Sequence, residues 1–192
     1  GVQTCALPIS LLDEVVRSAP ALHEAVLARA ELGIRRGDHA GASALLAPFV
    51  EEHPELPAAR ALLAAARWGE GRSSDALDLC RDLERDQPAD PQAPYWRGII
   101  LAGQGRADEA RAALCRALEL APGNFAILER LVEVEVSSGQ RVEAAQRLEA
   151  ELARTPPRQE PALLLARVLA SSVEVTRSEQ VLVAASARHP DS

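Results

Sequence analysis

Apolar residues recur along most of the chain at spacings of three and four positions, the period of an amphipathic α-helix. Short breaks that contain Gly or Pro separate these segments, so the pattern predicts successive pairs of helices. The first helices of the predicted pairs span residues 23–36, 57–69, 93–103, 125–137 and 160–171. The second helices span residues 39–52, 73–86, 107–120, 141–154 and 175–188.

The predicted helix pairs repeat every 34 residues without an insertion. Proline, which ends a helix, recurs at this interval at Pro20, Pro54, Pro88, Pro122, Pro156 and Pro190. Glycine, which suits a tight turn because it adopts positive φ, recurs at Gly37, Gly71, Gly105 and Gly139. A small residue early in the second helix recurs at Ala42, Ala76, Ala110 and Ala144. An apolar residue one turn later recurs at Leu46, Cys80, Leu114, Leu148 and Leu182. These four series predict a repeat array whose helices approach closely at the small residues.

The unit at residues 91–124 resembles a tetratricopeptide repeat through Gly98, Gly105, Ala110, Ala117 and Pro122. The resemblance covers nearly the whole chain. It implies an all-α solenoid of antiparallel helix pairs wound into a right-handed superhelix. The family's aromatic positions mostly hold other residues here, so the array is identified as a divergent one of bacterial type. Five repeats are expected in a single solenoid domain, at residues 23–56, 57–90, 91–124, 125–158 and 159–192.

The first residues depart from this pattern, because a proline occupies the small-residue position at Pro8 and costs about 3 kcal/mol inside a helix. The sequence GVQTCALPI also resembles the translation of a sequencing adapter. We therefore expect residues 1–9 to be non-native and residues 10–22 to be the truncated second helix of a partial repeat. Without a partner helix, its apolar residues would be exposed or poorly packed; these are Leu11, Leu12 and Val15.

The chain carries a net charge of -7, and all 21 basic residues are Arg. An acidic chain lacks the basic face that phosphate binding needs, so we expect no nucleic-acid partner. No apolar run approaches the roughly 20 residues of a membrane-spanning helix. We favour the cytoplasm as the compartment, with the periplasm or cell envelope as the alternative.

Residues that could carry chemistry are not arranged in a known site. The four His residues match no metal-ligand spacing, and Cys80 and Cys115 match no CxxC or zinc motif, so both cysteines are interpreted as packing residues. The turn at Gly103–Gly105 lacks the Lys that follows in a phosphate-binding loop. We therefore expect no catalytic residue, no metal site and no cofactor.

The resemblance implies that the first helix of each repeat lines a concave face, which such arrays use for binding. A stripe of this helix, at positions i, i+4 and i+7, comprises Leu27, Glu31, Ile34, Ala61, Ala65, Trp68, Tyr95, Ile99, Ala102, Glu129, Glu133, Val136, Leu163, Arg167 and Ala170. Exposed apolar stripes with aromatic residues mark binding surfaces. The partner-binding residues are accordingly predicted to be Leu27, Glu31, Ile34, Trp68, Tyr95, Ile99, Glu129, Glu133 and Arg167. Trp68 and Tyr95 could instead bury their rings between repeats, and the sequence leaves both alternatives open.

Some members of the family hold peptide carboxylates with Lys, Arg and Asn on this stripe, but the chain has no Lys and a single Asn, at Asn124. The stripe therefore predicts a noncatalytic scaffold for a partner protein or peptide with apolar and partly basic character. The alternative is a regulatory or substrate-recruiting arm of a larger enzyme, such as a glycosyltransferase, or of a bacterial sensor or transcription regulator. A domain of defined chemistry in the intact gene would favour this alternative.

Overall fold

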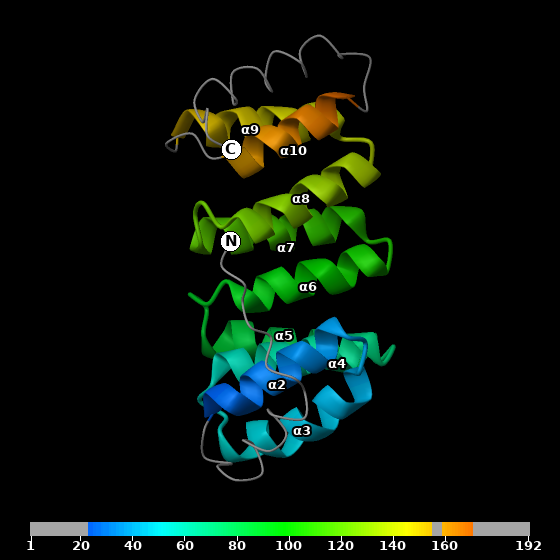
Figure 1. The fold of residues 1–192 in the computed structure, drawn as a ribbon, viewed down its shortest axis with the longest axis vertical. Coiled ribbons are helices and arrows are strands. Elements are labelled where there is room, and N and C mark those ends of the chain that lie inside the picture. The colour runs from blue at the N-terminus through cyan, green and yellow to red at the C-terminus, as the bar shows by residue number, and fades with distance from the viewer. Residues whose placement is uncertain (1–22, 155–158, 171–192) are drawn as a thin grey trace. The chain divides into compact units, whose positions relative to one another are not determined.

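The computed structural model of the chain describes residues 23–154 and 159–170, and within these ranges it contains α-helices and no strands (Figure 1). The helices are α2 (His23–Arg35), α3 (His39–Glu52), α4 (Pro57–Gly69), α5 (Ser73–Asp86), α6 (Gln92–Gly103), α7 (Ala107–Leu120), α8 (Phe125–Ser137), α9 (Arg141–Arg154) and α10 (Gln159–Ala170). Each bound agrees with the predicted one to within one residue. The predictions for residues 1–9, 10–22 and 175–188 lie outside the described residues.

Local residue chemistry explains where several helices begin. The Asn124 side chain accepts hydrogen bonds from the backbone N–H groups of Ala126 and Ile127, at 3.1 and 3.4 Å, and so caps α8. The Asp38 side chain accepts a hydrogen bond from Gly41 N at 3.0 Å and caps α3. These caps satisfy N–H groups that have no partner inside the helix. Helix α4 begins instead with Pro57, whose missing N–H and fixed φ suit the first helical position.

The turns within the helix pairs depend on the glycine series. Gly37, Gly71, Gly105 and Gly139 have φ values of 82°, 81°, 75° and 85°. These values lie in the left-handed region, which residues with a Cβ atom adopt only with strain. The repeated glycine therefore sets the geometry by which the chain reverses between two paired helices.

The chain divides into two compact units, with the boundary inside α6 after Ile100. In the first unit, α3 packs against α2 and α4, α4 packs against α5, and the two first helices α2 and α4 also touch. A core cluster joins α2, α3 and α4 through Ala30, Ala42, Leu46, Leu63 and Ala66. Ala42 and Ala76 are completely buried, as expected of small residues where paired helices meet closely.

In the second unit, α8 packs against α7 and α9, and α10 packs against α9 and α8. Its main core cluster includes Leu128, Val132, Ala144, Leu148 and Leu165. Ala110 and Ala144 are completely buried like their counterparts in the first unit. Four members of the apolar series are buried, namely Leu46, Cys80, Leu114 and Leu148, and the fifth, Leu182, lies outside the described residues. The fold is an all-α solenoid of helix pairs.

Candidate partner-binding surfaces

The first unit presents the predicted stripe on α2, α4 and α6. On α2, Leu27 and Ile34 are half-buried and pack against the cluster that α2, α3 and α4 share. Glu31 is exposed, and its Oε1 atom lies 3.9 Å from Nη2 of Arg35. This part of the stripe therefore combines apolar side chains that are partly used in the core with a solvated carboxylate.

The two aromatic residues of the stripe are both half-buried. Trp68 packs against the cluster of Ala64, Ala76, Cys80 and Ile100, so part of its ring belongs to the core. Tyr95 has its ring centroid 5.4 Å from that of Trp96, in an edge-to-face arrangement. Each ring thus combines burial with exposure, where the sequence suggested one or the other.

Two stripe positions on α4 contribute almost no surface. Ala61 and Ala65 are 1% and 2% exposed, respectively, so the stripe gains almost no surface from either residue. The cause is packing: Ala61 belongs to a cluster with Leu83 and Ala93, which brings α4 against α5 and α6. These two alanines, which are not among the predicted partner-binding residues, therefore serve the core. Ile99 on α6 is half-buried.

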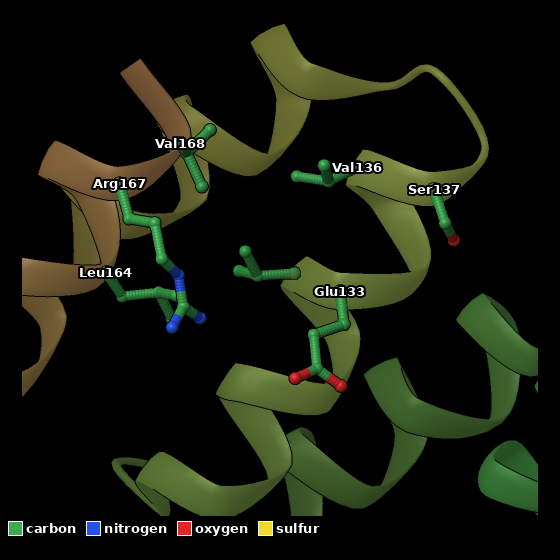
Figure 2. A pocket seen from close by; sticks show the side chains of 7 residues that line it. Glu133, Val136, Ser137, Leu164, Arg167 and Val168 are labelled. Carbon is green, nitrogen blue, oxygen red and sulfur yellow. The ribbon is translucent and has the colours of Figure 1, made fainter. Parts of the chain in front are cut away.

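The second unit contains a defined pocket between the first helices α8 and α10. Its volume is about 300 Å³, and its lining residues are Val132, Glu133, Val136, Ser137, Leu164, Arg167 and Val168. Figure 2 shows Val136 and Val168 pointing toward one another from the two helices, while Arg167 and Glu133 extend on one side of this apolar pair. The pocket thus combines aliphatic walls with two charged groups from opposite helices.

Three stripe residues line this pocket, namely Glu133, Val136 and Arg167. Glu129 does not line it, but its Oε1 atom lies 3.8 Å from Nη2 of Arg167. Tyr95 and Trp68 belong to the first unit. Sequence reasoning missed Val132, Ser137, Leu164 and Val168. The apolar pairs Val132–Val136 and Leu164–Val168, each spaced i, i+4, were the signal that a wider helix face is involved.

The charged side chains around the pocket differ in how closely they contact a partner of opposite charge. Arg130 donates a hydrogen bond of 2.7 Å from Nη1 to the Glu133 carboxylate, which therefore has a close cationic partner. The Arg167–Glu129 separation of 3.8 Å is longer than a hydrogen bond, and the Arg167 side chain is 67% exposed. Among the charged groups that line the pocket, Arg167 is thus the one most open to an incoming ligand.

A buried ion pair lies elsewhere in the second unit. Glu135 on α8 is completely buried, and its carboxylate accepts hydrogen bonds from Nε and Nη2 of Arg147 on α9, at 3.1 and 2.7 Å to Oε1. The hydrogen bonds to this carboxylate raise the pKa of Arg147 above its ordinary value. Nothing in the sequence singled out Arg147 as the partner of Glu135. We interpret the pair as structural because Glu135 is inaccessible.

The two cysteines of the described residues are both free. Cys80 is buried between α4, α5 and α6, and burial raises the pKa of its thiol to about 12, with a smaller contribution from Glu84. Cys115 lines a second pocket of about 410 Å³ between α7 and α9, beside Arg147 and Glu151.

Neither cysteine joins a cluster of metal ligands: residues 23–154 and 159–170 contain no group of three or more His, Cys, Asp or Glu arranged to hold a metal ion. In the same part of the chain, no helix is long and apolar enough to cross a membrane.

Comparison with known families decides the classification. Two family models, both described as tetratricopeptide repeat, match residues 27–94 and 61–125 in one case and residues 101–160 in the other. The chain belongs to the tetratricopeptide repeat family. No relative was found among curated protein sequences. The tetratricopeptide repeat fold generally serves as a scaffold for protein–protein interaction.

Solved structures share this tetratricopeptide repeat fold. The thermophilic TPR protein TTC0263 of Thermus thermophilus is 24% identical, with a TM-score of 0.72 over 84% of this chain and 88% of that one. Pseudomonas aeruginosa pilF is 21% identical, with a TM-score of 0.65 over 84% of this chain and 75% of that one. Yeast Tom70 is 16% identical, with a TM-score of 0.74 over 93% of this chain and 39% of that one. At these identities the similarity establishes the fold alone.

Proposed function

We propose that this tetratricopeptide repeat protein is a noncatalytic scaffold that binds a segment of a partner protein on the face formed by its first helices. The observation that carries the proposal is the pocket between α8 and α10, because it is apolar inside and charged at its edge. Binding sites typically combine these two features, since burial of apolar surface supplies affinity while a few polar groups orient the ligand.

We propose a separate patch in each compact unit. In the first unit it includes Leu27, Glu31, Ile34, Trp68, Tyr95 and Ile99. In the second unit it includes Glu129, Glu133 and Arg167 together with the aliphatic residues of the pocket. The half-buried aromatic rings of the first unit suit this role, because aromatic residues often anchor a partner in an interface.

The expected basic character of the partner rests on three carboxylates, at Glu31, Glu129 and Glu133. Each of these has an Arg within 4 Å, so none presents an isolated negative charge. Exposed pairs of this kind contribute little stability and can be exchanged for a partner's charge at small cost. We therefore propose that apolar contact dominates recognition and that these carboxylates tune it.

Site-specific photo-crosslinking tests the proposal with a control inside the same unit. Leu163 on α10 and Val142 on α9 are exposed large apolar residues, at 56% and 67%, but they lie on a first and a second helix, respectively. A photoreactive amino acid at position 163 should give a specific adduct in lysate of the source organism, and the same residue at position 142 should not. An adduct formed only from position 142 would contradict the assignment of the binding face.

The alternative, that the chain is an arm of a larger enzyme, sensor or transcription regulator, is compatible with the same binding face. The chain aligns with only 39% of yeast Tom70, which illustrates that such arrays occur within longer proteins. Recovery of the coding sequence on both sides of residues 1–192 tests this alternative. An adjoining domain of defined chemistry would support it, and the absence of one would contradict it.

A further inference from the structure

We propose that the pocket between α8 and α10 binds an aliphatic side chain of the partner segment, and that Arg167 pairs with an Asp or Glu carboxylate beside it. This inference rests on the proposed function, because it names the chemistry of the partner at one part of the same face. It departs from the sequence-based expectation of a partly basic partner.

The pocket walls define the apolar half of this recognition. Val132, Val136, Leu164 and Val168 are aliphatic side chains from two helices, and none of the described residues that line the cavity is aromatic. A volume of about 300 Å³ lies at the lower end of the range for ligand sites, which suits one or two side chains of a peptide better than a large cofactor. A branched aliphatic side chain matches both the size and the chemistry of these walls.

The charge arrangement defines the polar half. Glu133 already accepts the 2.7 Å hydrogen bond from Arg130, whereas among residues 23–154 and 159–170 Arg167 makes only the 3.8 Å contact with Glu129. A guanidinium presents several N–H donors in a planar fork that matches a carboxylate. A partner carboxylate can therefore engage Arg167 at the edge of the pocket without breaking a hydrogen bond that the described residues provide.

The surface next to Arg167 extends the apolar contact. Leu163 lies one helical turn before Arg167 on α10 and is 56% exposed. Residues spaced i, i+4 lie on the same face of a helix, so Leu163 and Arg167 present an apolar and a cationic group side by side. This juxtaposition complements a short segment in which an aliphatic residue and an acidic residue are close in sequence.

Selection from a library of random linear peptides displayed on phage tests the inference with the complete chain of 192 residues. Wild-type protein should enrich peptides in which a Leu, Ile or Val stands within two positions of an Asp or Glu. Arg167→Glu should shift this enrichment toward peptides with Arg or Lys beside the aliphatic residue. Arg141→Glu provides the matched control, because it makes the same charge change at an exposed position on the second helix α9.

Affinity in solution provides the second measurement. For a peptide selected by the wild-type protein, fluorescence anisotropy should show at least about tenfold weaker binding to Arg167→Glu and little change for Arg141→Glu. Circular dichroism checks that both variants keep their helices. Val136→Phe places a larger side chain in the pocket and should weaken binding of the same peptide to a similar extent.

The outcomes separate this inference from the proposed function. Enriched peptides that carry a basic residue beside the aliphatic one, or that bind Arg167→Glu as tightly as wild type, would overturn the inference. Selected peptides whose binding is weakened by Tyr95→Ala but not by Arg167→Glu or Val136→Phe would also overturn the inference. The proposed function would stand in that case. A library from which the wild-type protein enriches no peptide would contradict both.

Discussion

The carboxylate of Glu135 on α8 is completely buried and lies 2.7 Å from Nη2 of Arg147 on α9. The pair links the two helices of one repeat. A buried carboxylate is costly to remove from water, and the guanidinium repays this cost through hydrogen bonds and charge. Removal of either partner alone should therefore destabilise this repeat.

A double-mutant cycle tests this dependence. Arg147→Met removes the partner and leaves the carboxylate in an apolar environment, so we expect the free energy of unfolding to fall by about 3–5 kcal/mol. The double variant Glu135→Leu with Arg147→Met replaces both charges and should recover most of this loss. Urea unfolding of the wild type, the single variants Arg147→Met and Glu135→Leu, and the double variant measures the coupling. Additive effects of the two substitutions would show that the pair does not act as a unit.

Cys80 predicts a specific dependence of stability on alkaline pH. Its pKa is raised from 9.0 to about 12 in the folded chain, so above pH 9 the unfolded state loses the thiol proton while the folded state retains it. Stability should therefore fall as pH rises through this window, and the Cys80 contribution should amount to about 1.4 kcal/mol per pH unit. Urea unfolding at pH 8 and pH 10, under reducing conditions, compares wild type with Cys80→Ala. The same pH dependence in both proteins would show that Cys80 does not contribute.

The turn glycines predict a purely conformational effect. Gly105 has a φ of 75°, and a Cβ atom built there would meet no neighbouring atom within 4 Å. Gly105→Ala should therefore reduce the free energy of unfolding by about 1–2 kcal/mol through backbone strain alone. Gly105→Asn is the matched control, because Asn tolerates the left-handed region better and should cost less. Equal losses for Ala and Asn, measured by thermal unfolding, would argue against strain as the cause.

Substitution of Trp68 should mainly lower the stability of the protein, whereas substitution of Leu163 should mainly weaken partner binding. Trp68 is half-buried against the cluster of Ala64, Ala76, Cys80 and Ile100, so Trp68→Ala should cost about 2 kcal/mol, less than truncation of a fully buried Trp. Leu163 is 56% exposed, so Leu163→Ala should change stability by less than about 0.5 kcal/mol and still weaken partner binding. Chemical denaturation measures the free energy of unfolding of each variant, and fluorescence anisotropy measures the affinity of the same samples for the selected peptide. A large loss of stability in Leu163→Ala would show that this side chain serves the core.

The helix bounds could be predicted from the sequence because they follow from local rules that repeat every 34 residues. Each turn glycine, each small residue at a helix crossing and each apolar seam residue acts within its own repeat, and the series Leu46, Cys80, Leu114 and Leu148 is buried as expected. The partners of individual side chains could not be predicted. Glu135 and Arg147 are 12 positions apart in the sequence, and only the packing of α8 on α9 brings them together.

The candidate site was predictable in part for the same reason. A stripe at i, i+4 and i+7 includes three residues that line the pocket between α8 and α10, namely Glu133, Val136 and Arg167. It does not give the depth to which each residue is buried, which depends on how tightly neighbouring helices pack. Ala61 and Ala65 are buried for this reason, and Leu164 and Val168, which line the pocket from positions beside the stripe, are also largely buried in the core.

Methyl NMR spectroscopy tests the central claim most directly, because it reports where a partner segment contacts the protein. The sample is the complete chain with labelled Val and Leu methyl groups, titrated with a peptide selected by the wild-type protein. We predict the largest shift changes at Val132, Val136, Leu164 and Val168, with little change at Val142 on α9. Changes centred on Val142 and the second helices, with the pocket methyls unaffected, would contradict the account.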